Sequence, residues 1–439
     1  MIALTTAGTL GILVAGPFIA VAVYYLFAVL RPQFIWEWAL PPGIPWSQYV
    51  GGAAIVGGIA AALGLVPSAE AGNRLRRASV AHVMVVVFGL WVTVTYFTAQ
   101  DRAVAGLWLP EYLKIFAMFV VATLVVTTGA QIFTLYLVIT CALIYIAYEV
   151  NVLYLVDGRL DIYHHGYGGF DNNGAALMLA MGVPLSLYAW EAIGGLKRWL
   201  FAAAIPVLLH AVLMTYSRGA MLALLVAAPV VILRSRRRWQ FSLAGVALAC
   251  MIPLLAGPEI RDRFFTVYDA ASDASANLRF DSWRAAIRIA NDFPIVGVGI
   301  RNSNLLSYSY GADIEGRTIH SQYLQTLADA GYVGLGLYIA ALAAVWVALV
   351  RSRRALKERT DTEAYRLRSI VSGIEGSLLV FCTGAAFLSL EVFELPYLLA
   401  LLGCQIWVVT RASLPAAATS DAPDGVTHFA SGALTGGRL

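Results

Sequence analysis

Long apolar runs separated by short polar segments are the dominant pattern along the chain. A helix needs about 20 apolar residues to cross the hydrocarbon core of a bilayer. The pattern therefore predicts an all-α polytopic membrane protein with about twelve transmembrane helices, and neither a second domain nor an internal repeat stands out. The runs lie near residues 8–30, 49–66, 78–98, 111–128, 131–149, 171–191, 199–213, 219–233, 240–257, 321–350, 369–390 and 396–410.

Composition supports this prediction and excludes a single water-soluble globule. The chain is 60% hydrophobic and 13% charged. The first run follows neither a basic segment nor a convincing cleavage site, so we interpret it as a retained span rather than a removed signal peptide. The four cysteines are widely spaced within the runs and are predicted to be packed apolar residues, not disulfide partners or metal ligands. They are Cys141, Cys250, Cys382 and Cys404.

Positive charge alternates between successive loops. Short cytoplasmic loops retain Lys and Arg, so this alternation predicts a cytoplasmic N-terminus. Residues 1–411 would then form the membrane domain, and residues 412–439, rich in Ala, Ser, Thr and Gly, a disordered cytoplasmic tail. The basic loops contain Arg74, Arg76 and Arg77, then Lys197 and Arg198, then RSRRR at 234–238 and RSRRALKERTDTEAYRLR at 351–368.

The loop at 258–319 is the one extended polar segment predicted on the outer side. Long loops can cross a membrane regardless of their charge. Clustered arginines suit bidentate binding of phosphate, which suggests an anionic partner outside. Ion pairing with acidic residues of the same loop is an equally good interpretation for most of them. The arginines are Arg261, Arg263, Arg279, Arg284, Arg288, Arg301 and Arg317.

The stretch TYSRGA at 215–220 places Arg218 at the turn between two apolar runs. A charge at a membrane interface is expensive to bury and is a functional candidate, although snorkelling to the headgroups is the simpler interpretation. Ser217 and Gly219 indicate a tight turn into a helix N-terminus, whose free N–H groups favour an anion. Arg218 is therefore a candidate phosphate ligand.

The stretch NLRFDSWRAAIRIANDFPIVGVG at 277–299 has the spacing of an amphipathic helix lying on the membrane surface, ended by Pro294. Arg284 and Arg288 are one turn apart and share a face, while Arg279 lies near the start. Basic residues on the wet face of such a helix usually contact lipid headgroups. This alternative is slightly favoured for Arg284 and Arg288.

A histidine precedes the next apolar run in TIHSQYLQTLADAGYVG at 318–334. The run is predicted to begin as an amphipathic helix and then to span. An imidazole at a wet interface titrates near neutral pH and suits a proton acceptor, so His320 is a candidate base. A capping or structural histidine fits these facts equally well.

Two other polar pairs carry weaker hypotheses. His164 and His165 could ligate a metal, but no cysteine or carboxylate cluster with zinc-like spacing surrounds them, so no metal site is predicted. Asn172 and Asn173 open a span from the outer side, where helix capping is the usual role of asparagine.

These stretches together resemble the O-antigen ligase and polymerase superfamily of bacterial inner-membrane glycosyltransferases. The resemblance covers about residues 165–350 and rests on the order of four segments around one long outer loop. They are FDNNGAALMLAMGVPL, TYSRGA, LRFDSWRAAIRIANDFPIVGVGIRNS and IHSQYLQTLADAGYVGLG.

The resemblance implies a membrane-embedded, GT-C-like glycosyltransferase with a periplasmic active site. The donor would be an undecaprenyl-diphosphate-linked glycan, with no metal, cofactor or nucleic acid involved. Arg218 and Arg279 match arginines that bind the diphosphate, and His320 matches an essential histidine. Arg284 and Arg288 are further candidates for diphosphate binding. Ser321 stands where many members have asparagine, which changes the hydrogen bonding expected beside the histidine.

The resemblance leaves the acceptor open. An O-antigen ligase would use a lipid A–core oligosaccharide, a polymerase a second lipid-linked repeat, and a protein O-oligosaccharyltransferase a side-chain hydroxyl. The expected lack of a large C-terminal periplasmic domain favours a glycolipid acceptor and thus the ligase. The non-enzymatic alternative is a glycolipid transporter, against which acidic residues in the runs are few and no paired broken helices indicate an inverted repeat.

Overall fold

The computed structural model describes most of the predicted membrane domain. Its described residues are 1–41, 43–44, 46–65, 78–157, 162, 166–240, 242, 274–390 and 392–413. Several predictions concern residues outside this set. They are the run at 240–257 with Cys250, the loop arginines Arg74, Arg76, Arg77, Arg261 and Arg263, the metal alternative at His164 and His165, and the tail from residue 414.

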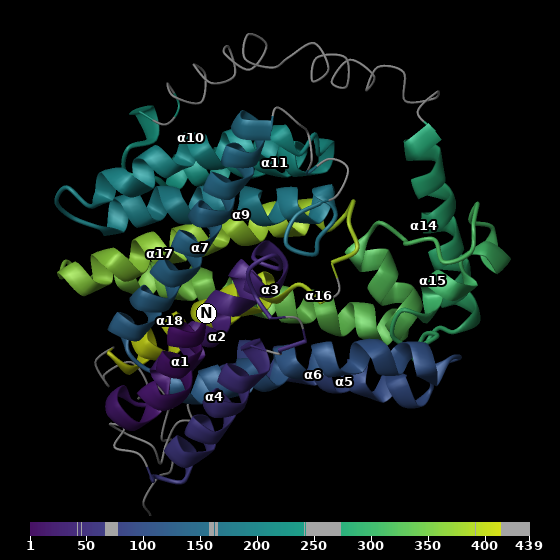
Figure 1. Cartoon of the computed structure of the whole chain (residues 1–439), viewed down its shortest axis with the longest axis horizontal. Coiled ribbons are helices and arrows are strands. Elements are labelled where there is room, and N and C mark those ends of the chain that lie inside the picture. Colours follow the sequence, from purple (N-terminus) through teal and green to yellow (C-terminus); the bar gives the residue numbers. More distant parts are fainter. Residues whose placement is uncertain are drawn as a thin grey trace, which may run out of the picture.

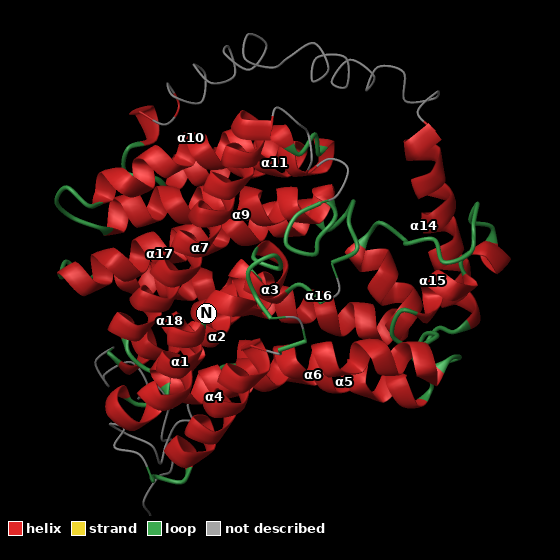
Figure 2. Ribbon diagram, viewed as in Figure 1, coloured by secondary structure: helices red, strands yellow, loops and turns green. Residues whose placement is uncertain are grey.

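The described chain consists of helices joined by loops, and its only extended pairing among the described residues is an isolated bridge between Tyr167 and Phe170 (Figures 1 and 2). Seven of the described helices are long and apolar enough to cross a membrane: α5, α6, α7, α9, α16, α17 and α18. This confirms the prediction of an all-α polytopic membrane protein. The helices are α1 (Ile2–Ala15), α2 (Phe18–Leu30), α3 (Pro32–Ile35), α4 (Trp46–Ala62), α5 (Val80–Phe97), α6 (Arg102–Val125), α7 (Gly129–Asp157), α9 (Asn172–Ala192), α10 (Arg198–Met214), α11 (Arg218–Arg234), α14 (Ala274–Asp292), α15 (Asn302–Leu306), the 3₁₀ turn η4 (Tyr308–Tyr310), α16 (Gln322–Lys357), α17 (Thr362–Gly384) and α18 (Glu394–Ala412).

The first predicted span is wrong as a single helix. The run at 8–30 divides into α1 and α2 at Gly16, whose φ of 81° is open to glycine without strain. The helices fold back on each other, since a Cβ atom at Gly8 would lie 3.1 Å from Val23 Cγ1 and one at Gly11 would lie 3.1 Å from Ile19 Cγ2. At 1.5 Å per residue α2 is about 20 Å long, which is shorter than the hydrocarbon core.

Helices α9 and α17 form the centre of the bundle, with 83% and 78% of their most apolar windows buried. Small residues let the helices approach closely, as is usual where lipid removes the hydrophobic drive between helices. A Cβ at Gly373 of α17 would lie 2.2 Å from the Tyr136 hydroxyl, which donates a 2.7 Å hydrogen bond to the Leu185 carbonyl of α9. Glycine is therefore required where α7, α9 and α17 meet.

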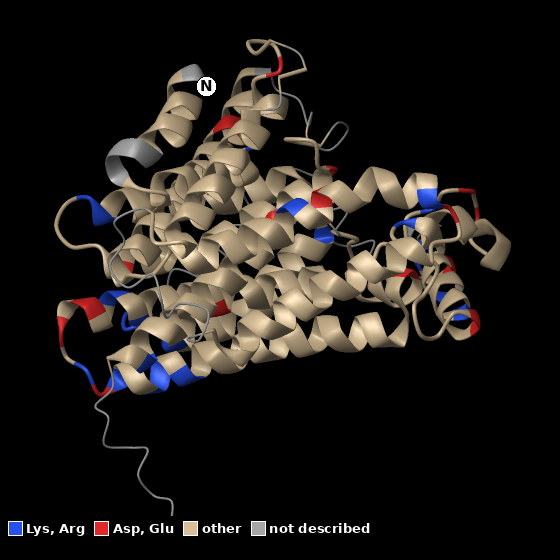
Figure 3. Cartoon of the chain, turned by 90° about the horizontal axis from the view of Figure 1, so that it is seen from below, with Lys and Arg blue, Asp and Glu red and all other residues tan. Residues whose placement is uncertain are grey.

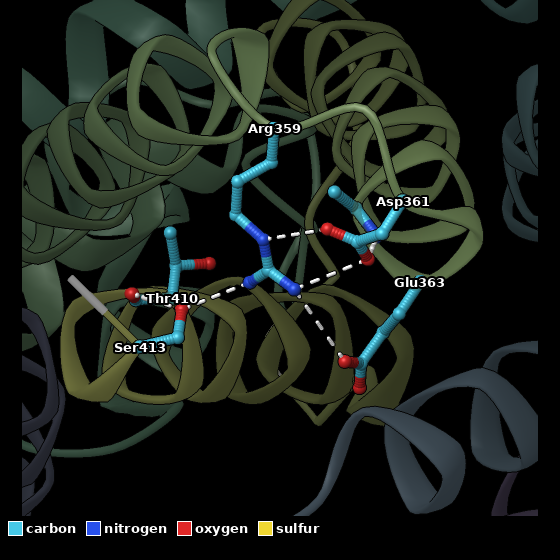
Figure 4. Close-up of polar contacts among 6 residues, drawn as sticks. Arg359, Asp361, Glu363, Thr410 and Ser413 are labelled. Carbon is cyan, nitrogen blue, oxygen red and sulfur yellow. Dashed lines mark hydrogen bonds and ion pairs between the residues drawn. The ribbon is translucent and has the colours of Figure 1, made fainter.

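Basic residues lie at both ends of the bundle, and one group of them gathers at the end where several short loops meet (Figure 3). The described basic loops at 193–198, 235–239 and 358–361 all lie there, as alternating loops of one orientation should. Two ion-pair clusters tie the helices together at this end. Glu375, with a fully buried side chain, pairs with Arg234 and lies 2.6 Å from Arg353 Nη1. Arg359 donates to Asp361 at 2.9 Å and to the Ser413 hydroxyl at 2.9 Å (Figure 4).

Helix α16 is broken at Gly331, between the polar start and the apolar span. Gly331 has φ 73° and ψ −178°, a conformation that is essentially restricted to glycine. The backbone of residues 294–299 crosses at this break: Tyr332 donates its N–H to the Pro294 carbonyl at 2.8 Å, and Val298 donates to the Ala328 carbonyl at 3.0 Å. The break thus fixes residues 322–330 against the outer segment.

We expect Gly331→Ala to lower the free energy of unfolding by about 1–3 kcal/mol, the usual cost of a disfavoured backbone conformation. The new Cβ would also lie 2.2 Å from the Ile295 carbonyl oxygen. Gly336→Ala is the matched control on the same helix, because a Cβ there meets nothing within 4 Å. Thermal unfolding in detergent measures both, and equal midpoints would show that the break at Gly331 carries no strain.

Candidate active site

The segment that opens α9 and the turn that opens α11 are held together by hydrogen bonds. The Ser217 hydroxyl donates to Asn173 Oδ1 at 2.8 Å, and Asn172 Nδ2 donates to the Thr215 carbonyl at 3.2 Å. The N-cap of α9 is Asp171, whose Oδ1 accepts from the Gly174 N–H at 2.7 Å. The prediction that the two asparagines cap the helix is therefore wrong. They instead join the two segments.

Arg218 is the first residue of α11, as the turn in TYSRGA predicted. Ser217 caps the helix by accepting from the Ala220 N–H at 3.4 Å, and Tyr216 makes the turn with a φ of 56°. Arg218 is half-buried. The Arg218 side chain thus projects from a helix N-terminus, where the helix dipole adds positive charge.

The loop between α17 and α18, residues 385–393, connects this turn to α14. The Phe387 Cβ lies 3.7 Å from the position of a Cβ on Gly219. The Phe387 ring also faces Trp283 of α14, with the centroids 6.4 Å apart. Arg279 is half-buried and lies one helical turn before Trp283, on the same side of α14. Gly219, next to Arg218, and Trp283, one turn after Arg279, therefore contact the same loop from two different helices.

Arg284 and Arg288 point away from Arg279. On an ideal helix they are rotated by about 140° and about 180° from it. The Arg284 side chain is 68% exposed and lies 3.1 Å from Asp281, while Arg288 donates to the Tyr310 carbonyl at 3.0 Å. The structure therefore separates these two arginines from the Arg279 side of the helix.

His320 lies immediately before α16 with a left-handed φ of 55°. It is half-buried, and its neighbour Ser321, buried at 3% exposure, is the N-cap of the helix, accepting from the Leu324 N–H at 3.4 Å. The next residue, Gln322, donates its N–H to the Ala385 carbonyl at 2.8 Å. Ser321 thus performs the capping, and the imidazole of His320 is not used for it.

Burial lowers the pKa of His320 below its ordinary value of 6.5, and the positive charges of Arg279 and Arg317 lower this pKa further. The carboxylate of Asp171 raises it, so it partly opposes these effects. The imidazole is consequently neutral at pH 7 and able to accept a proton. These interactions also place Arg279 and Asp171 within electrostatic range of His320.

A polar face of α16 was missed by the sequence analysis. Gln322, Gln325 and Asp329 recur at spacings of three and four, which puts them on one side of the helix. Asp329 accepts from the Arg301 and Ser303 N–H groups, each at 3.0 Å, and Gln325 Nε2 donates to the Ser303 hydroxyl at 2.7 Å. This face anchors the outer segment beside His320, and the spacing was the signal that could have found it.

The charge of Asp171 was also missed, although its position before an apolar run, three residues ahead of Gly174, is typical of an N-cap. In the part of the chain that the structure describes, no group of three or more His, Cys, Asp or Glu side chains is arranged to hold a metal ion. Arg279 and Arg317 supply positive charge near His320.

We expect Asp171→Asn to lower the pKa of His320, because the variant removes the carboxylate that raises it. Asparagine caps helices as well as aspartate does, so α9 should keep its start. The acidic limb of a pH–rate profile would move to lower pH. Arg317→Gln, which removes a charge that lowers this pKa, should move the limb to higher pH. Limbs that do not move, or that move the other way, would contradict this electrostatic assignment.

A model of the O-antigen ligase family matches residues 202–339. The matched segment contains Arg218, Arg279 and His320. Comparison with curated proteins gives no match. Members of the matched family are glycosyltransferase-like ligases and polymerases. The helical membrane bundle and this match over residues 202–339 both support the resemblance to the O-antigen ligase and polymerase superfamily.

Proposed function

We propose that this protein is an O-antigen ligase of the bacterial inner membrane. It would transfer a glycan from undecaprenyl diphosphate to a lipid A–core oligosaccharide on the periplasmic side. The observation that carries this proposal is the position of His320 beside Arg279, just before α16, whose opposite end carries the basic residues Arg354 and Lys357. A neutral histidine next to fixed positive charge suits attack by a hydroxyl on a sugar diphosphate.

The arginines would hold the donor and stabilise its leaving group. Arg218 and Arg279 can each bind phosphate oxygens with two parallel N–H donors. Negative charge grows on the diphosphate as the glycosidic bond breaks, and pre-positioned cations stabilise that charge in the transition state. Arg284 and Arg288, predicted as further contacts of the diphosphate, are exposed on another face of α14 than Arg279.

His320 would act as the general base. The acceptor hydroxyl oxygen forms a bond to the anomeric carbon, while the bond from that carbon to the phosphate oxygen breaks and leaves its electron pair on the diphosphate. The proton of the hydroxyl passes to the imidazole. Attack opposite the leaving group inverts the anomeric centre. With two guanidinium groups supplying positive charge, we expect transfer to need no added cofactor and to persist with a chelator.

Purified protein in liposomes tests this proposal. Undecaprenyl-diphosphate-linked glycan and lipid A–core are supplied with a chelator and without nucleotide, and the products are separated on a gel. Glycan-bearing lipopolysaccharide is the expected product. Glycan chains lengthened on the lipid carrier would make the protein a polymerase, and a glycosylated protein acceptor would make it an oligosaccharyltransferase. Movement of the lipid-linked glycan across the bilayer without transfer would exclude the enzyme.

A further inference from the structure

A cavity of about 340 Å³ lies beside the candidate active site, formed mainly by α2, α6 and the starts of α4 and α18. This volume is within the range of small-molecule sites. The wall of the cavity includes Phe170, the residue directly before Asp171. The cavity therefore reaches the residue next to Asp171 in the chain. Its walls come from other helices than α11 and α14, which carry Arg218 and Arg279.

Aromatic rings line much of this cavity. Trp46, Trp108 and Phe170 contribute from three segments of the chain, and the Phe170 ring is held edge-on against Phe393 at a centroid distance of 5.4 Å. The Trp108 ring lies 4.2 Å below the guanidinium of Arg301, which fixes it from the side of the outer loop. Rigid aromatic faces carry a negative quadrupole that attracts the positively polarised C–H groups of a saturated ring.

Buried polar groups line the same cavity. Glu394 forms an ion pair with Lys114 at 3.1 Å, and Lys114 also contacts Glu111 at 2.6 Å. The second oxygen of Glu394 lies near the Tyr24 hydroxyl, but beyond this contact neither atom has a hydrogen-bond partner among the described residues. Tyr24 is only 1% exposed. Buried polar groups normally find partners, so this pair is suited to a hydroxyl-bearing ligand.

The aromatic and polar residues that line the cavity together favour one class of ligand. A lipid tail would leave the Glu394 oxygen and the Tyr24 hydroxyl without any partner beyond each other, which is unfavourable. The two carboxylates of the lining, Glu111 and Glu394, are matched by two cations. Lys114 is paired with both carboxylates, and Arg31 lies over the Phe170 ring at 4.2 Å. The lining therefore carries no net charge and favours a neutral ligand over a phosphate. A sugar has both C–H faces for the aromatic rings and hydroxyl groups that donate to a carboxylate and accept from a phenol.

We propose that this cavity is a subsite for sugar residues of the acceptor glycan. The inference rests on the proposed function, in which the donor diphosphate occupies the arginines of α11 and α14. In-line displacement requires the acceptor to approach from the side opposite the leaving group. The cavity opens among α2, α6 and α18, next to the residue that precedes Asp171, and so could present a hydroxyl of a bound acceptor to His320.

Kinetics of purified variants test the subsite. Trp108→Ala should raise the KM for the core acceptor about three- to tenfold, from the loss of aromatic contact, and leave the KM for the donor unchanged. Trp108→Phe should restore most of the acceptor affinity. Trp38→Ala, which removes an 86% exposed aromatic residue outside the cavity, is the matched control and should change neither constant.

Direct binding separates this inference from the proposed function. Saturation-transfer NMR with lipid-free core oligosaccharide should show contact with the wild type and weaker contact with Trp108→Ala. Ligation that proceeds with an unchanged acceptor KM in Trp108→Ala would overturn the subsite and leave the ligase intact. A rise in the donor KM instead would overturn the assignment to the acceptor. Oligosaccharide binding without any glycan transfer would support the subsite and contradict the ligase.

Discussion

Glycan transfer by the His320→Asn variant should fall by about 10²–10⁴-fold, the usual contribution of a positioned general base. Asparagine is the informative replacement because it tolerates the left-handed backbone that His320 adopts at φ 55°. Alanine at this position would combine loss of the base with backbone strain. The expected signature is a loss in kcat with a donor KM close to that of the wild type.

The control for this variant is Tyr308→Ala, which removes a 54% exposed side chain from the same outer segment. It should transfer glycan at nearly the wild-type rate. The pH–rate profile adds an independent check, since the acidic limb should report a pKa below the ordinary histidine value and vanish in His320→Asn. Transfer at more than a tenth of the wild-type rate in His320→Asn would rule out this residue as the base.

Arg218→Lys and Arg279→Lys should each lower kcat/KM by about 10–150-fold, which corresponds to the loss of one charged hydrogen bond. Lysine retains the positive charge but cannot bind two phosphate oxygens in the fixed geometry of a guanidinium. The loss should therefore be large even though the net charge of the site is unchanged. Single-turnover transfer with labelled donor measures the effect on the chemical step.

Arg284→Lys is the comparison within α14. Because Arg284 is exposed and paired with Asp281, its replacement should reduce transfer much less than Arg279→Lys does. Equal losses at Arg279 and Arg284 would mean that the diphosphate binds along both faces of α14. A normal rate in both Arg218→Lys and Arg279→Lys would leave the leaving group without its proposed stabilisation.

The apolar periodicity was sufficient to predict the membrane class and most helices, because burial in lipid imposes a length on every span. It failed at the first run, where hydropathy continues across Gly16 although the backbone reverses there. It also could not locate the break at Gly331, since the residues on both sides are compatible with a helix. In both cases a single glycine conformation, which hydropathy does not encode, decided the path of the chain.

Local sequence and tertiary structure contributed differently to the candidate site. TYSRGA encodes its own turn and cap, so Arg218 at the start of α11 followed from the sequence alone, as did the position of His320 before α16. The sequence also places Arg279, Arg284 and Arg288 on one helix. It does not show which neighbour each face of that helix meets. Only packing of α14 against α16 determined that Arg279 lies toward His320 while the other two arginines face away. Similarly, the carboxylate of Asp171 reaches His320 across 149 positions of sequence. Contacts over such separations depend on how helices pack, and local patterns carry no information about them.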